Sequence, residues 1–259
     1  MNSAKSYQPV WMGALTGLAV LILWYFSSLA IDKKIVPTAG AILPFVTAGF
    51  GAFCGSYFAF MLRRYEEKQA KLDERKAALD ACIFTLFRQH KAMTIVKSHY
   101  DEYSDEFARA LFMPAGSLGD QKDNKIKFED LNFLSELGEI KHLMELTDLQ
   151  YGFETAVVSV ELRAKFHTET LGPVAQEKLQ DEGQYTVEQM REILGNHIFH
   201  GAFAYTSNAY EFVQKNIIDN QLIHQKTWEI AKRTFPSHKF LRPTINPSIQ
   251  PPGTDPQQP

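Results

Sequence analysis

Two apolar stretches near the N-terminus dominate the hydrophobic pattern of the chain. Residues 10–31 and 39–62 contain no Asp, Glu, Lys or Arg, although charged residues make up 22% of the 259 positions. The first stretch would be about 33 Å long as an α-helix, and the hydrocarbon core of a bilayer is about 30 Å thick. Both stretches are therefore predicted to be transmembrane helices.

The ends of the two stretches fit this interpretation. Trp11 lies at one end of the first stretch, and Trp24 and Tyr25 lie toward the other. Amphipathic aromatic rings prefer these positions at the membrane–water interface. Arg63 directly follows the second stretch, and residues 32–38 leave only a short connection between the two. We expect a helical hairpin.

An alternative for the first stretch is a cleaved signal peptide. Ser28 and Ala30 would suit the small-residue positions of a cleavage site. However, the apolar run is longer than the usual core of a signal peptide, and only Lys5 precedes it as a charged side chain. A spanning helix is the preferred interpretation.

Positive charges near the predicted spans indicate their orientation. Residues 63–76 contain six Lys and Arg, whereas residues 32–38 contain two. Lys and Arg favour the cytoplasmic side. The sequence therefore predicts a cytoplasmic N-terminus at 1–9, a short extracytoplasmic loop at 32–38 and a cytoplasmic helical domain at 63–235. The bilayer, taken to be a bacterial inner (cell) membrane, is the first expected partner.

Small residues recur at helical spacing in both predicted spans. Gly13 and Gly17 lie in the first span, and Gly51, Gly55 and Ala59 lie in the second. Such faces let helices approach closely within a membrane. We expect them to pack the hairpin together, and the alternative is that they drive homo-oligomerisation. Neither span contains an ionisable group, which argues against a pump or transporter.

A long amphipathic helix is predicted after the second span. Residues 63–113 contain no Pro or Gly, and their apolar residues recur at steps of three, four and seven. We expect this helix to continue from the membrane and to end at Pro114. Residues 114–127 are predicted to form a loop, and residues 128–137 a short helix.

The second long helix is predicted over residues 139–171. Gly172 and Pro173 are expected to end it. Residues 155–160 are rich enough in β-branched side chains to suggest a strand, but the helical period on both sides favours a helix.

The third long helix is predicted to begin after Thr186 and to run toward Phe235. Thr186 and Gln189 have the spacing of a capping box. Asn216 and Asn220 interrupt the apolar stripe, so they are expected to be solvated or to set the register of the bundle. The expected core residues are Met190, Leu194, Ile198, Tyr205, Ala209, Phe212, Ile223 and Ile230.

Three such helices predict an all-α antiparallel helical bundle with coiled-coil-like packing. Residues 236–259 contain seven of the 12 prolines and are predicted to be a disordered tail. The net charge of −3 and the lack of a basic motif argue against nucleic-acid binding. Cys54 and Cys82 do not suggest a disulfide framework and are interpreted as small buried apolar residues.

Two pairs of residues have the spacing of metal ligands. Glu139 and His142 match one E-x-x-H motif, but a di-iron bundle needs two such motifs and two further glutamates. His197 and His200 could share a helix face, but no set of carboxylates accompanies them. The sequence therefore predicts no metal, no cofactor, no catalytic residue and no enzyme activity.

The leading interpretation is a membrane-anchored helical scaffold that self-associates or binds a cytoplasmic protein partner. The alternatives are an oligomerising, pore-forming effector and a signal-relay protein that is triggered through its cytoplasmic bundle.

Overall fold

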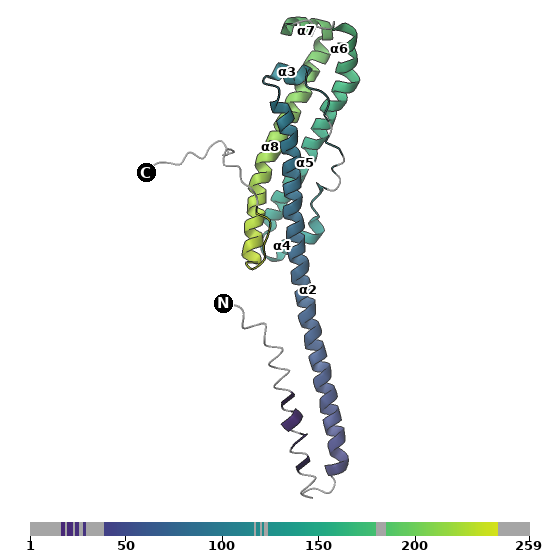
Figure 1. Ribbon diagram of the computed structural model, residues 1–259, viewed down its shortest axis with the longest axis vertical. Coiled ribbons are helices and arrows are strands. Elements are labelled where there is room, and N and C mark those ends of the chain that lie inside the picture. The colour runs from purple at the N-terminus through teal and green to yellow at the C-terminus, as the bar shows by residue number, and fades with distance from the viewer. Residues whose placement is uncertain are drawn as a thin grey trace, which may run out of the picture. The chain divides into compact units, whose positions relative to one another are not determined.

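The structure is a computed structural model in which every regular element of the described residues is a helix (Figure 1). The described residues are 17–18, 20–22, 24–25, 28–29, 39–116, 118–119, 121, 124–179 and 185–242, with the side chains of 39–46 left out. The prediction of an all-α protein is confirmed for this part of the chain.

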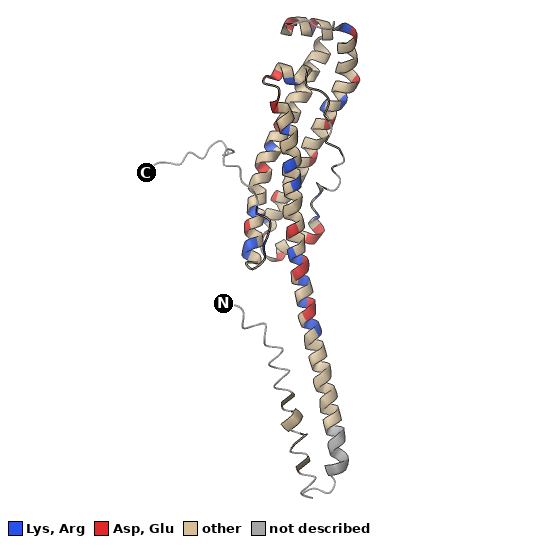
Figure 2. Ribbon diagram, in the orientation of Figure 1, with Lys and Arg blue, Asp and Glu red and all other residues tan. Residues whose placement is uncertain are grey.

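The chain divides into two compact units, residues 1–74 and residues 75–259. Helix α2 (Ala39–Asp101) begins in the first unit and continues without interruption into the second. The predicted continuation of the second apolar stretch into a long helix is therefore confirmed. Figure 2 shows charged residues along α2 from Arg63 onward and none in the described part before it.

The first unit contains exposed apolar side chains on α2. They are Phe50, Phe53, Tyr57, Phe60, Met61, Leu62, Tyr65 and Leu72. Within the described residues, no helix has an apolar stretch long enough to cross a membrane. The predicted first span (10–31) lies mostly outside the described residues, and the N-terminus (1–9) and the loop (32–38) lie wholly outside them.

The helix that was predicted over residues 63–113 is interrupted. Helix α2 ends at Asp101, and α3 (Glu106–Leu111) follows as a separate short helix. The carboxylate of Asp105 caps α3 by accepting a hydrogen bond from the backbone N–H of Ala108 at 2.7 Å. Asp favours such N-cap positions over helix interiors, so the prediction of one unbroken helix was wrong here.

Three long helices build the core of the second unit: α2 from Arg75 onward, α5 (Ile140–Phe166) and α8 (Asn196–Thr234). Figure 1 shows them side by side. One apolar cluster includes Leu79, Leu86, Leu146, Leu149, Ile230 and Phe235. The next cluster along the bundle includes Met93, Tyr100, Phe153, Val160, Ala209 and Val213.

These clusters give the direction of each helix. Residue numbers rise together along α2 and α5 and fall along α8, so α2 and α5 are parallel and α8 is antiparallel to both. The predicted antiparallel packing is therefore wrong for α2 and α5. Parallel neighbours need a long crossover, and the described residues of the segment 112–139 return along the bundle, burying Ile126 and Leu131 in the first cluster.

The returning segment contains the short helix that was predicted at 128–137. It consists of a 3₁₀ turn, η3 (Phe128–Leu131), and α4 (Phe133–Glu136). Gly138 follows with a φ of 80°, a conformation that glycine adopts without strain.

Helix α5 does not stop at Gly172 and Pro173 as predicted. A π-helical turn, η4 (His167–Leu171), leads directly into α6 (Gly172–Lys178). Pro173 falls in the first turn of α6, where its missing N–H costs little. Residues 155–160 are helical within α5, so the alternative of a strand is excluded.

The third predicted helix is divided by Gly195, which has φ 80° and ψ 151°. The capping box of Thr186 and Gln189 is confirmed at the start of α7 (Val187–Leu194). Helix α8 then runs from Asn196. Of the expected core residues, Met190, Leu194, Ala209, Ile223 and Ile230 are buried, Ile198 is half-buried, and Tyr205 and Phe212 are exposed.

The first residues of the predicted disordered tail pack against the bundle. Phe240 belongs to the first apolar cluster, and the Nε2 atom of His238 lies 2.7 Å from an Asp80 carboxylate oxygen. The prediction of a disordered tail therefore does not hold for residues 236–242, and residues 243–259 lie outside the described part.

Candidate functional site

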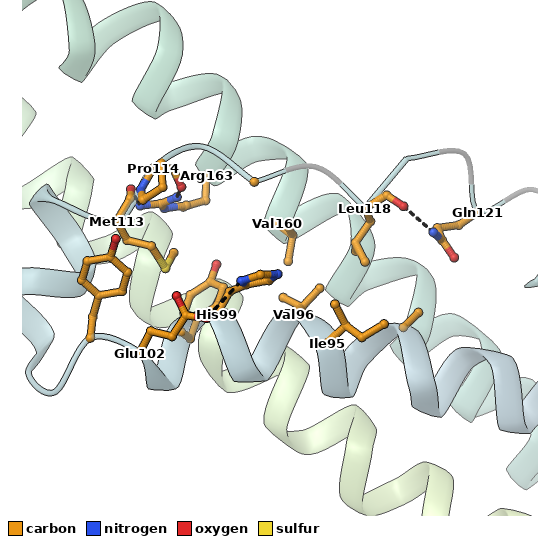
Figure 3. Close-up of a pocket in the computed structure, with 14 residues that line it drawn as sticks. Ile95, Val96, His99, Glu102, Met113, Pro114, Leu118, Gln121, Val160 and Arg163 are labelled. Carbon is orange, nitrogen blue, oxygen red and sulfur yellow. Dashed lines mark hydrogen bonds and ion pairs between the residues drawn. The ribbon is translucent and has the colours of Figure 1, made fainter.

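A cavity of about 400 Å³ lies where the C-terminal part of α2, the segment after α3 and helix α5 meet (Figure 3). Its apolar walls are formed by Ala92, Ile95, Val96, Met113, Pro114, Leu118 and Val160. Its polar lining includes His99, Tyr100, Glu102, Tyr103, Gln121 and Arg163. This combination of apolar walls and a few polar groups is typical of small-molecule sites.

Arg163 is the most unusual group of this cavity, because it is only 3% exposed. Its guanidinium donates hydrogen bonds to the backbone carbonyls of Pro114 (2.6 Å), Arg109 (3.3 Å) and Met113. No Asp or Glu among the described residues pairs with it. Burial lowers the pKa of Arg163, and Tyr100 and Tyr103 oppose this effect. The guanidinium therefore holds the end of α3 and the following segment against α5.

Tyr100 supplies a second polar group. Its side chain is 3% exposed, and its hydroxyl has no hydrogen-bond partner among the described residues. Its ring stacks on Tyr210 of α8, with the centroids 5.6 Å apart. Burial raises the pKa of Tyr100, and the nearby charge of Arg163 opposes this effect. The hydroxyl therefore remains a protonated donor near neutral pH.

A glutamine network crosses the core below this cavity. Gln89 Nε2 donates to the Asn124 carbonyl (2.7 Å) and to Gln150 Oε1 (2.9 Å). Gln150 Oε1 also accepts from the backbone N–H of Ile126 at 3.1 Å. These bonds join α2, α5 and the returning segment, so they fix the register of the two parallel helices.

A second hydrogen-bond network lies between α5 and α8. The Thr227 hydroxyl donates to the Ile223 carbonyl (2.7 Å), so it accepts from His142 Nε2 at 3.0 Å. His142 Nδ1 lies 3.3 Å from Glu145, which also binds Lys226. Burial lowers the pKa of His142, and its hydrogen bond to Glu145 opposes this effect.

Other polar groups of the core have no hydrogen-bond partner among the described residues. Both amide atoms of Asn216 and Asn220 are in this position, and so is Nε2 of His224. Asn216 and Asn220 are therefore buried rather than solvated. Burial, with a smaller contribution from the charge of His90, lowers the pKa of His224 from 6.5 to about 4.

A groove of about 330 Å³ runs between α5 and α8. Tyr151 and Leu222, which are 73% and 69% exposed, lie along it, and buried Asn216 belongs to its lining. Asp148 and Asp219 also line it, and neither carboxylate forms an ion pair with a described residue. The groove therefore combines an exposed apolar surface with unpaired negative charge.

The two residue pairs that have the spacing of metal ligands have protein partners or are exposed in the structure. Glu139 pairs with Arg233, and both ring nitrogens of His142 have protein partners. His197 and His200 are exposed. No group of three His, Cys, Asp or Glu residues in the described part of the chain could hold a metal ion.

The glycines of the predicted membrane faces remain without an observed packing partner. A Cβ atom added at Gly17, Gly51 or Gly55 would meet nothing within 4 Å, Gly13 lies outside the described residues, and Ala59 is exposed on α2. The packing role of these residues stays a prediction.

The two cysteines differ in their surroundings. Cys82 is buried in the first apolar cluster, as expected, and burial raises its pKa to about 12. Cys54 is half-buried, and both thiols are free.

Sequence reasoning missed the cavity and the glutamine network. A signal for Arg163 was available, because it follows Val160 by three residues and Ala156 by seven on the buried face of α5. Gln89 likewise lies between Leu86 and Met93 at core spacing.

Comparison of the chain with protein-family models, with curated proteins and with solved structures found no match.

Proposed function

We propose that the protein is a membrane-anchored helical scaffold that binds a helix of a cytoplasmic protein in the groove between α5 and α8. The anchoring part of this proposal rests on the uncharged sequence of residues 10–31 and 39–62. Phe53, at 69% exposure on α2, is one of several large apolar side chains that the first unit leaves uncovered. Lipid would cover such side chains.

The observation that carries the binding proposal is the exposed apolar surface beside the groove. Met144, Tyr151 and Val158 recur at intervals of seven residues on α5, and all three are more than half exposed. Leu222 of α8 faces the same groove as Tyr151. A groove between two helices with apolar side chains at helical spacing suits an amphipathic helix, which would add a fourth helix to the bundle.

The charges of the groove indicate the chemistry of the partner. Asp148 and Asp219 form no ion pair with a described residue, Glu145 is already bound by Lys226, and Lys215 is the basic residue that α8 contributes to the lining. A partner helix with apolar residues on one face and Lys or Arg at its edges would match both features.

Site-specific photocrosslinking in cells tests the binding proposal. A photoreactive benzoylphenylalanine replaces Tyr151 or Leu222, and the matched control places it at Phe84, which is exposed on α2 outside the groove lining. We expect one crosslinked product of defined mass from the two groove positions and none from the control. A product of twice the chain mass would show that the bound partner is a second copy of this chain. No product at either position would refute the proposal.

Membrane extraction tests the anchor separately. The double variant Phe50→Arg and Phe53→Arg adds two charges that each cost about 2.5–3.5 kcal/mol near the centre of a membrane helix. We expect alkaline carbonate to release this variant and to leave wild type and the control Phe84→Arg in the membrane. Release of the wild type would refute the anchor.

Signal relay is a second candidate function. The uninterrupted course of α2 from Ala39 to Asp101 favours it, because one continuous helix contains both the apolar segment and, in its C-terminal part, residues of the cavity lining. Insertion of two glycines after Lys68 would break a relay along α2 and leave groove crosslinking unchanged.

A further inference from the structure

The cavity between α2 and α5 has the features of a site for a small anionic ligand. Its walls are apolar over most of their area, and Arg163 and Tyr100 are the buried polar residues of its lining. The volume of about 400 Å³ lies within the range of about 300–1,000 Å³ that is usual for ligand pockets. Figure 3 shows Val96, Leu118 and Val160 on the apolar side and Arg163 next to Pro114.

Two groups in this cavity lack the partner that their burial demands. The Arg163 guanidinium has carbonyl acceptors but no carboxylate among the described residues. Backbone carbonyls carry only a partial negative charge. A buried cation is normally paired with a group that carries a full negative charge. Tyr100 is also a residue of the cavity lining, and its buried hydroxyl has no hydrogen-bond partner among the described residues.

We propose that this cavity binds a small amphipathic carboxylate, with its carboxylate toward Arg163 and Tyr100 and its apolar body against Ile95, Val96 and Val160. The carboxylate supplies the missing negative charge and accepts the tyrosine hydrogen bond. Glu102 does not oppose it strongly, because this side chain is exposed and lies 3.5 Å from His99. The site is separate from the groove between α5 and α8, so it does not depend on the proposed scaffold function.

Calorimetric titration of the full-length chain in lipid nanodiscs, from which free detergent has been removed, tests the proposal. The probe is 3-phenylpropionate, and 3-phenylpropan-1-ol has the same apolar body without the charge. Because hydrogen bonds to charged groups contribute about 1.5–3 kcal/mol, the acid should bind at least about tenfold more tightly than the alcohol. Equal affinity, or no binding of the acid at about 1 mM, would overturn the proposal.

Two variants locate the binding. Val160→Phe fills the cavity and should abolish binding, whereas Leu162→Phe places the same ring at an exposed position of α5 outside the cavity lining and should leave the affinity unchanged. Tyr100→Phe removes one hydroxyl and should weaken binding of the acid by about tenfold, and binding of the alcohol by less, because a hydrogen bond to a neutral oxygen contributes less than one to a carboxylate. Circular dichroism checks the folding of each variant. If Val160→Phe does not fold, the result for Tyr100→Phe decides, and unchanged acid binding in that variant would overturn the proposal.

Discussion

Acid should destabilise the helical bundle through His224. This side chain is buried among the three long helices, its Nε2 has no hydrogen-bond partner among the described residues, and its pKa is lowered from 6.5 to about 4. In the unfolded chain the imidazole regains its ordinary pKa. Between the two values the unfolded state binds a proton that the folded state does not, so stability falls as pH decreases through 6.5.

The size of the effect follows from the two pKa values. At pH 7.5 neither state is appreciably protonated at His224, and the contribution is close to zero. At pH 5 the unfolded state is protonated and the folded state is mostly neutral, which costs about 2 kcal/mol. The loss levels off below about pH 4. Burial also lowers the pKa of His90 and His142. In acid the wild type should therefore lose more stability than His224 alone accounts for.

Guanidinium unfolding of the full-length chain at pH 7.5 and pH 5 measures the loss. A background of Trp11→Phe and Trp24→Phe leaves Trp228 of α8 as the single fluorescent reporter of the bundle. His224→Leu should reduce the acid-induced loss by about 2 kcal/mol relative to this background. His197→Leu, at an exposed position of the same helix, is the matched control. If His224→Leu loses as much stability between the two pH values as the background does, the reasoning is refuted.

Three further changes in stability can be measured with the same reporter. Asn220→Leu removes two buried amide atoms that have no hydrogen-bond partner among the described residues and should stabilise the bundle by about 1–3 kcal/mol; a lower midpoint would show that these atoms are satisfied. Gln150→Leu leaves the N–H of Ile126 and Nε2 of Gln89 without their shared acceptor and should cost about 2–3 kcal/mol, whereas no loss would mean that the network contributes little. Gly195→Ala forces a side chain into a backbone conformation that only glycine adopts readily and should cost about 2 kcal/mol, and an unchanged midpoint would contradict the φ and ψ described above.

Hydrophobic periodicity predicted the helices well, because each long helix buries one continuous stripe. It did not predict their interruptions. The break before Asp105 depends on a single capping hydrogen bond, and the break at Gly195 depends on one backbone conformation. Pro173 misled the prediction because a π-helical turn lets a new helix begin around it.

Hydrophobic periodicity predicts neither the direction of the helices nor the candidate site. A loop at 114–127 was predicted, but its length alone does not distinguish a turn from a crossover along the bundle. The cavity collects residues from α2, α5 and this crossover, which lie far apart in sequence. Core positions such as Gln89 and Asn220 were missed or left open, because a polar residue in an apolar stripe indicates solvent as readily as a buried network.

The parallel order of α2 and α5 also has a consequence for synthesis of the protein on the ribosome. The buried face of α2, from Leu79 to Tyr100, is not complete until α8 has been synthesised, because Ile230 of α8 lies in the first core cluster. About 130 residues separate Tyr100 from Ile230, which corresponds to roughly 7–26 s at about 5–20 residues per second. During that interval the nascent chain exposes an apolar helix face, so chaperone contact or premature association with a neighbouring nascent chain is expected at this stage.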